Sequence, residues 1–177
     1  DFEKAFLDHQ KAFNVQPTNM QICLGYSYAL LRYGKFDQGW TLFECRPQPP
    51  HHTAGIRLWD GRAPLEGKKI LVMREGGYGD SILFLRWMAE LQDRGAETFL
   101  HAWEDQAGIF VGHPWVNHVL TDEESINPKN FDYCVSILSL PALLHCEADK
   151  IPAAERYIVA HPDDVRAQRG EPRVDRS

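Results

Sequence analysis

The sequence predicts an α/β protein in which a parallel sheet, with helices on both faces, follows an all-α repeat segment. Three observations support this fold class. A continuous apolar run, Ile70–Met73, is followed by glycines and then by apolar residues at helical spacing. Strand-like and helix-like segments alternate after it, which is the pattern of parallel sheets. Within the first fifty residues, Phe2 and Phe36 belong to a set of similar residues that recur 34 positions apart.

The recurrence indicates paired helices in residues 1–50. A period of 34 residues is that of tetratricopeptide repeats, each of which is a pair of helices joined by a turn. In this phase Gly34 lies at the turn between paired helices. Ala5 and Gly39 are then the small residues at which two helices cross closely. We therefore expect residues 1–50 to be a tetratricopeptide-like segment with a surface for a peptide partner.

Composition divides the rest of the chain into a linker, a second domain and a tail. Residues 51–56 are expected to be a linker, because the stretch 47–54 contains three prolines and has no apolar period. The histidine pair in it has no carboxylate or cysteine at ligand spacing, so we interpret it as exposed rather than as a metal site. Residues 57–160 form the predicted α/β domain. Residues 161–177 have almost no apolar side chains and are expected to be a poorly ordered tail.

The run Ile70–Met73 is expected to be the first strand, buried on both faces of the sheet. The glycines after it allow a tight turn and are Gly76, Gly77 and Gly79. Asp80 then opens a helix as its expected N-cap, and the helix ends at Gly95. Ligands on doubly wound sheets bind at the carboxyl ends of the strands. We therefore expect Asp80 at the edge of the sheet where chemistry would occur.

Three more strands and two more helices complete the predicted domain. The strands are expected at Thr98–Trp103, Val116–Leu120 and Phe131–Leu138. The helices are expected at Asp105–Val111 and Leu140–His145. Strands that alternate with helices in this way predict a parallel sheet with helices on both of its faces.

A series of motifs across the chain resembles a known family. After the repeat come Trp59-Asp60-Gly61, the turn Gly77-Tyr78-Gly79-Asp80 and a helix with Phe84 and Arg86. The segments FDYCVSILSLP and IPAAERYI follow. Together they resemble bacterial tetratricopeptide-linked glycosyltransferases similar to O-linked N-acetylglucosamine transferases and, more distantly, the heptosyltransferase family. That family has two Rossmann-like halves, of which residues 57–160 can hold only the first.

The resemblance implies an inverting transfer of a sugar from a nucleotide-sugar donor to a protein or glycan acceptor. The donor is held chiefly by the second half, so this chain would supply the acceptor side and alone would be inactive. No acidic pair of the DxD type is present, so neither a metal nor another cofactor is expected. The chain begins in mid-helix and is interpreted as part of a longer protein. Gly76 and Leu83 depart from the family, which usually has glutamines there.

Asp80 is the candidate catalytic residue, because the heptosyltransferase resemblance implies that it takes the proton of the acceptor hydroxyl. Its alternative role is purely structural, since aspartate also caps helices. The candidate substrate-binding residues lie in the same turn or at the end of the fourth strand: Glu75, Gly76, Gly77, Tyr78, Gly79 and Ser139. The alternative function is a non-catalytic tetratricopeptide interaction module with a scaffold α/β domain.

Composition argues against several other classes of protein. The formal net charge is −6 and no basic cluster is present, which argues against a dedicated nucleic-acid binder. The longest apolar stretch, Tyr133–Leu144, is too short to cross a bilayer, so no membrane span is expected. The four cysteines are far apart and form no CxxC pair, which favours a reducing cytoplasm over a disulfide framework.

Overall fold

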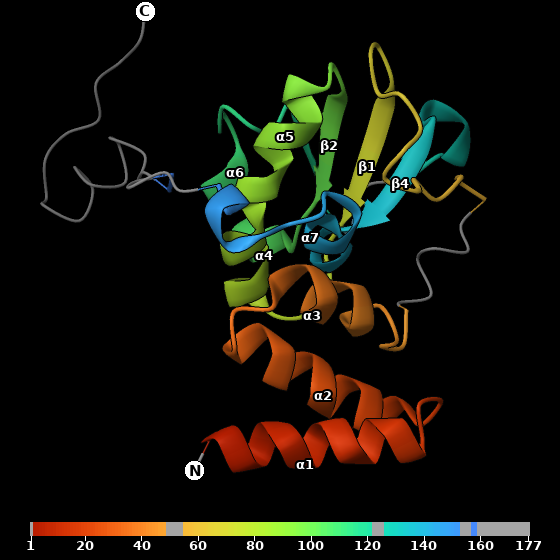
Figure 1. Ribbon diagram of the computed structural model, residues 1–177. Helices are drawn as coiled ribbons and strands as arrows, with labels where there is room; N and C mark the ends of the chain where they lie inside the picture. The colour runs from red at the N-terminus through yellow and green to blue at the C-terminus, as the bar shows by residue number, and fades with distance from the viewer. Residues whose placement is uncertain (1, 49–54, 122–125, 153–156, 159–177) are drawn as a thin grey trace, which may run out of the picture.

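The computed structural model describes residues 2–48, 55–121, 126–152 and 157–158 (Figure 1). A helical segment lies below a four-stranded parallel sheet in this view. The predicted tail and most of the predicted linker, with its histidine pair, lie outside the described residues. Within the described parts, no helix has the length and apolarity needed to cross a membrane.

The first part of the chain forms three helices. They are α1 (Phe2–Val15), α2 (Met20–Arg32) and α3 (Phe36–Phe43). Asn19 caps α2, because its side-chain oxygen accepts the N–H groups of Gln21 and Ile22. Gly34 has a positive φ of 72°, which suits the turn between α2 and α3. The helical prediction for this segment is confirmed, while its assignment as a tetratricopeptide repeat stays a prediction.

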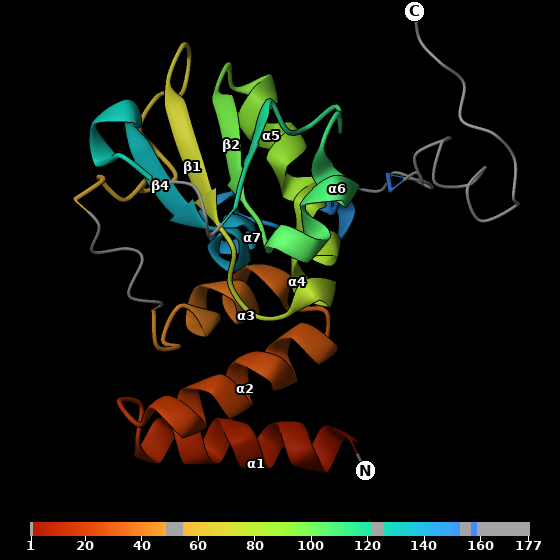
Figure 2. The ribbon, with the colours of Figure 1, turned by 180° about the vertical axis from the view of Figure 1, so that it is seen from behind.

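Adjacent helices in this segment run antiparallel and pack closely (Figure 2). A Cβ atom on Gly39 would lie 2.7 Å from Cδ2 of Leu31, so α2 and α3 cross closely there. The ring of Phe6 in α1 lies 5.8 Å from that of Tyr26 in α2. Ala5, which stands one period before Gly39, is exposed and lines an open groove between α1 and α2.

The sheet has the strand order β3-β2-β1-β4, and every pair of neighbours is parallel. Its strands are β1 (Lys69–Met73), β2 (Glu97–His101), β3 (His118–Leu120) and β4 (Tyr133–Ser136). All four predicted strands are confirmed, although the last three are shorter than predicted. β4 ends at Ser136 because its hydroxyl oxygen accepts the N–H of Leu138 at 3.2 Å and turns the chain into a 3₁₀ helix. The parallel α/β class is therefore shown.

Short helices follow the strands. They are α4 (Tyr78–Phe84), η2 (Leu85–Trp87), α5 (Met88–Asp93), η3 (Glu104–Gln106), α6 (Ala107–Phe110), η4 (Pro128–Asn130), η5 (Ile137–Ser139), α7 (Leu140–Leu143) and η6 (Ala148–Lys150). The helix expected to begin at Asp80 begins at Tyr78 instead, with Gly77 as its N-cap. It is also divided by η2. Its predicted end at Gly95, where φ is 83°, is confirmed.

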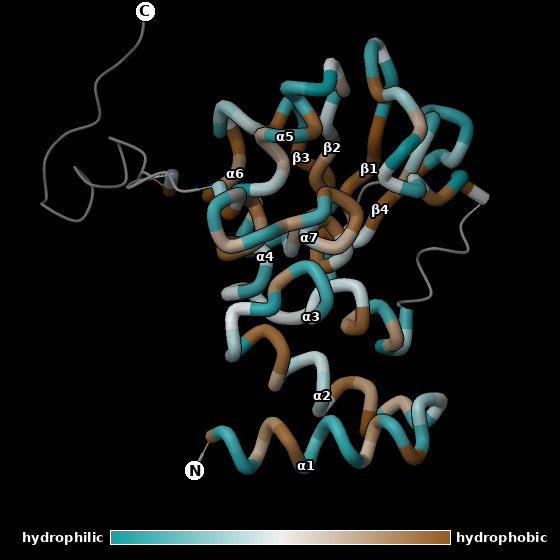
Figure 3. The backbone as a smooth tube through the Cα atoms, viewed as in Figure 1, coloured by the Kyte–Doolittle hydropathy of each residue, from teal (hydrophilic) through white to brown (hydrophobic). Residues whose placement is uncertain are grey.

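The two faces of the sheet are covered differently, which corrects the prediction of helices on both. Ile70 and Val72 point into a core shared with α4, α5 and α6. Leu71 and Met73 point to the other face, where the packed side chains come from strands and loops rather than from described helices. The reason is the connection from β3 to β4, whose described part crosses this face with only the three-residue 3₁₀ helix η4. In Figure 3 the strands form the most continuous hydrophobic part of the chain.

The helical segment lies against the carboxyl edge of the sheet. The arrowheads of β1 and β4 point toward α3 in both ribbon views. Trp40 of α3 packs edge-on against Phe84, with ring centroids 5.5 Å apart, and against Trp87 at 6.5 Å. α3 also packs against α7. The edge at which doubly wound sheets bind ligands is therefore partly covered by this chain's own helix.

Candidate functional site

Asp80 is held in the glycine turn after β1. It occupies the third position of α4, and its Oδ2 accepts the N–H of Gly77 at 2.7 Å. A helix N-terminus leaves such N–H groups without intrahelical partners, so this bond stabilises the start of α4. Asp80 therefore caps the helix from its third position and not as the predicted N-cap.

Gly76 is required by the same arrangement. Its φ is +78°, a region that side chains other than glycine rarely adopt. A Cβ atom at this position would lie 2.4 Å from Oδ2 of Asp80. The turn therefore brings the Asp80 carboxylate directly against the backbone of Gly76. By contrast, Gly79 lies inside α4, and nothing lies within 4 Å of the position a Cβ would take there.

The second oxygen of Asp80 is available for chemistry. Asp80 is half-buried and lies at the carboxyl edge of the sheet. Within the described parts of the chain, its Oδ1 atom makes no hydrogen bond, whereas Oδ2 is bound to Gly77. One oxygen of this carboxylate thus orients the group and the other could accept a proton from a hydroxyl within hydrogen-bond distance.

Glu75 is bound by an arginine that the sequence analysis did not identify. Arg46, three residues beyond the end of α3, donates from Nε to Oε1 of Glu75 at 2.7 Å and from Nη2 to Oε2 at 2.8 Å. This is the two-point geometry in which arginine binds a carboxylate most specifically. The side chains are 5% and 13% exposed, respectively. Glu75 therefore anchors the turn and is not a solvated residue at its mouth.

Ser139 belongs to the same cluster. Its Oγ accepts a hydrogen bond from Nη2 of Arg46 at 2.7 Å and donates one to Oε2 of Glu44 at 2.8 Å. Ser136 donates to Glu75, and Arg46 also donates from Nη1 to Glu44. We call these residues the Arg46 cluster: Glu44, Arg46, Glu75, Ser136 and Ser139.

The Arg46 cluster contains two carboxylates and one guanidinium. Burial alone would lower the pKa of Arg46, but its hydrogen bonds and charge interactions with Glu75 and Glu44 raise the pKa above the ordinary value. Arg46 therefore remains charged. Glu75 and Ser139, two of the predicted substrate-binding residues, already use their polar atoms within this cluster.

Tyr78 lies on the other side of the turn, toward β2. Its hydroxyl donates a hydrogen bond to Asp105, which raises the pKa of Tyr78 above its usual value. The ring is 5.9 Å from that of Trp103, and Gln106 donates from Nε2 to the backbone oxygen of Tyr78 at 2.8 Å. We call these residues the Tyr78 cluster: Tyr78, Trp103, Asp105 and Gln106. Tyr78 is 50% exposed and Asp105 is also exposed, so these two side chains face solvent, whereas Gln106 is buried.

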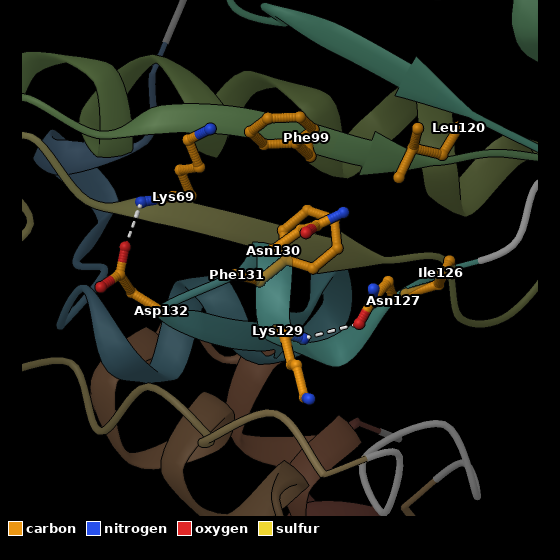
Figure 4. Close-up of a pocket in the computed structure, with 9 residues that line it drawn as sticks. All are labelled: Lys69, Phe99, Leu120, Ile126, Asn127, Lys129, Asn130, Phe131 and Asp132. Carbon is orange, nitrogen blue, oxygen red and sulfur yellow. Dashed lines mark hydrogen bonds between the residues drawn. The ribbon is translucent and has the colours of Figure 1, made fainter.

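A separate groove of about 680 Å³ lies on the other face of the sheet, where η4 is the helix nearest to it in the described part of the chain (Figure 4). Its floor is apolar, with Phe99 and Phe131, and Lys129 lies on its rim. Lys69 and Asp132 line it at the amino ends of β1 and β4, which is the end of the sheet opposite the Asp80 turn. The groove is therefore not part of the candidate site.

Other groups add no metal site within the described parts of the chain, where no three histidine, cysteine or acidic side chains are placed to hold an ion. Comparisons with protein families, curated proteins and solved structures found no match to this chain.

Proposed function

We propose that this chain supplies the acceptor-side half of an inverting glycosyltransferase, with Asp80 as the general base. The observation that favours this function is that the two oxygens of the Asp80 carboxylate have different surroundings. Oδ2 is fixed by the Gly77 N–H, while Oδ1 has no partner among the described residues. A base in this position is oriented before the substrate arrives, which lowers the cost of reaching the reactive geometry.

The proposed reaction needs only the acceptor, the donor and the Asp80 carboxylate. Oδ1 of Asp80 takes the proton of an acceptor hydroxyl as the hydroxyl oxygen bonds to the anomeric carbon of the donor sugar. The bond between that carbon and the nucleotide phosphate breaks, and the nucleotide leaves with the electron pair. A single displacement of this kind inverts the anomeric configuration. The acceptor is a protein or a glycan, and the donor is a nucleotide-sugar held mainly by a second half.

The Arg46 cluster supports an acceptor-side role. Every N–H group of Arg46 is bonded, to Glu75, Ser139, Glu44 and the backbone oxygen of Phe43. The cluster has an excess of one negative charge and offers its guanidinium to no phosphate. We therefore expect calorimetric titration with UDP-, GDP-, ADP- and CMP-sugars to show binding no tighter than about millimolar, or roughly −4 kcal/mol. Micromolar binding to this chain would contradict the acceptor-side assignment.

The test of the base is Asp80→Asn in the full-length protein. Asparagine keeps the shape and one acceptor oxygen for the Gly77 N–H, so thermal unfolding should change little. Its amide cannot accept the proton, so sugar transfer in a single turnover should slow by about 10²–10⁴-fold. The rate is measured as the release of free nucleotide. Asp93→Asn, at an exposed position at the end of α5, is the matched control. Unchanged turnover in Asp80→Asn would remove Asp80 as the base.

The non-catalytic interaction module is the second candidate. It is favoured by the position of α3 and Arg46, which cover part of the edge where a ligand would bind. A full-length protein that releases no nucleotide from any of these donors but binds a peptide on its helical segment would support the module. We place either form of the protein in the cytoplasm, because all four cysteines are free thiols, as expected in a reducing compartment.

A further inference from the structure

The strand order defines a crevice position between β1 and β4. From β1 the chain leads to β2 and β3 on one side and then returns to β4 on the other. In doubly wound sheets the loops diverge at this point, and ligands bind between them. Here the side chain of Arg46 joins the two loops, since it is bonded to Glu75 after β1 and to Ser139 after β4. A residue from the helical segment therefore fills the position at which such sheets hold a ligand.

Arg46 also ties the end of α3 to both loops. Its guanidinium carbon lies 4.7 Å from the centroid of the Phe43 ring, and Nη1 donates to the Phe43 backbone oxygen at 3.5 Å. Charged side chains are rarely this buried unless they are paired. Loss of Arg46 would leave the Glu75 carboxylate buried without its partner, which is the costly way to break an ion pair.

Glu75 connects this contact to the turn of Asp80. It directly precedes Gly76, where the positive φ turns the chain toward Gly77, whose N–H binds Asp80. Gly76 and Gly77 have no side chains that could fix the turn themselves. On the β1 side of the turn, Glu75 is therefore the nearest side-chain anchor before Asp80, and Arg46 holds it in place.

We propose that Arg46 is a positioning residue, through which the docking of α3 against the sheet sets the orientation of the Asp80 carboxylate. The catalytic consequence rests on the proposed function, whereas the structural dependence of the turn on Arg46 does not. The helical segment then has a role beyond any partner that it binds. The Asp80 carboxylate is oriented for the reaction only when α3 is packed against the sheet.

Hydrogen exchange read by mass spectrometry tests the structural part. In Arg46→Met, measured where the variant is folded, exchange in residues 74–84 and 136–140 should be about tenfold or more faster, because the buried anchor is lost. Exchange in α1 should not change. Arg62→Met removes an exposed arginine outside the cluster and is the matched control. Wild-type protection of residues 74–84 in Arg46→Met would overturn the proposal.

Arg46→Lys provides a second variant in case Arg46→Met does not fold. Lysine keeps the charge but cannot bind both oxygens of Glu75 in the planar geometry of arginine. Exchange in residues 74–84 should therefore lie between that of the wild type and that of Arg46→Met. Faster exchange than in the wild type supports the proposal, and equal exchange overturns it.

Kinetics of the full-length protein test the catalytic part. Arg46→Met should lower kcat at an unchanged KM for the donor, and Arg46→Lys should restore part of kcat. A change in KM alone would contradict a positioning role. If the unaltered protein transfers no sugar, the proposed function fails, while the exchange experiment still decides whether Arg46 orders the turn.

Discussion

The two sides of the Asp80 turn differ in how their polar groups are used. Toward β4, Arg46 is buried and Glu75 is largely buried, and the two side chains are bonded to each other. Toward β2, Tyr78 is 50% exposed and is bonded to the exposed Asp105. Only the second side could hydrogen-bond an incoming hydroxyl without first breaking a buried ion pair. The Arg46 cluster therefore anchors the turn, whereas Tyr78 and Asp105 are in contact with solvent. Under the proposed function, an acceptor would approach from the side of Tyr78.

The comparison separates two kinds of residue that look alike in the sequence. Glu75 and Tyr78 both lie in the glycine-rich turn, and both were predicted to bind substrate. Their surroundings differ because Arg46 reaches only the β4 side. A carboxylate at the end of a buried strand thus acts as an anchor, and an aromatic residue three positions later remains accessible.

Removal of one carboxylate charge on each side of the Asp80 turn gives the largest expected difference in stability between the two sides. Glu75→Gln removes one of the two carboxylates that bind the buried guanidinium, while Glu44 remains. The loss of these charge-assisted hydrogen bonds should lower the free energy of unfolding by about 1.5–3 kcal/mol. Asp105→Asn changes an exposed group and should stay within about 0.5 kcal/mol of the wild type. Urea unfolding of both variants provides the measurement. Similar losses for the two would show that the two sides of the turn are equally structural.

Glycine substitutions test the turn itself at an intermediate size of effect. Gly76→Ala places a Cβ at a positive φ and against Asp80, so it should destabilise by about 1–2 kcal/mol or more. Gly79→Ala adds a helix-favouring side chain where nothing lies within 4 Å, so it should stabilise by about 0.5–1 kcal/mol. Thermal unfolding would compare them. Equal midpoints would contradict the backbone geometry of the turn.

Much of this architecture could be predicted from local sequence patterns. The apolar run at β1 and the helix-ending Gly95 depend on neighbouring residues, and both were predicted correctly. The start of α4 was predicted at Asp80 but lies at Tyr78. The prediction was wrong because Asp80 caps the helix from its third position and not from the N-cap. One face of the sheet lacks a described α-helix because the described part of the connection from β3 to β4 forms only η4. Alternation of segments alone does not reveal this.

The Arg46 cluster could not be predicted in the same way. Arg46 is separated from Glu75 by 29 positions and from Ser139 by 93, so only tertiary packing brings them together. One signal was nevertheless present in the sequence. Glu75 lies two positions beyond a strand expected to be buried on both faces, and a buried carboxylate in such a place requires a partner. A search for an unassigned arginine near an element boundary would have included Arg46.

The smallest expected effect concerns the proton on Tyr78. The hydrogen bond to Asp105 raises the pKa of the folded-state phenol above its usual value near 10. A raised folded-state pKa means that the associated stabilisation is fully present below pH 10 and is lost as the pH rises through the folded-state value. The difference in ultraviolet absorbance between the wild type and Tyr78→Phe isolates this tyrosine from the other five. In Asp105→Asn the midpoint should fall toward the ordinary value, because the carboxylate that holds the proton is gone. If Asp105→Asn left the midpoint unchanged, Tyr78 would not be held by that carboxylate in solution. The exposed side of the turn would then lack a fixed position for the Tyr78 hydroxyl, and that position is what sets it beside the anchored Arg46 side.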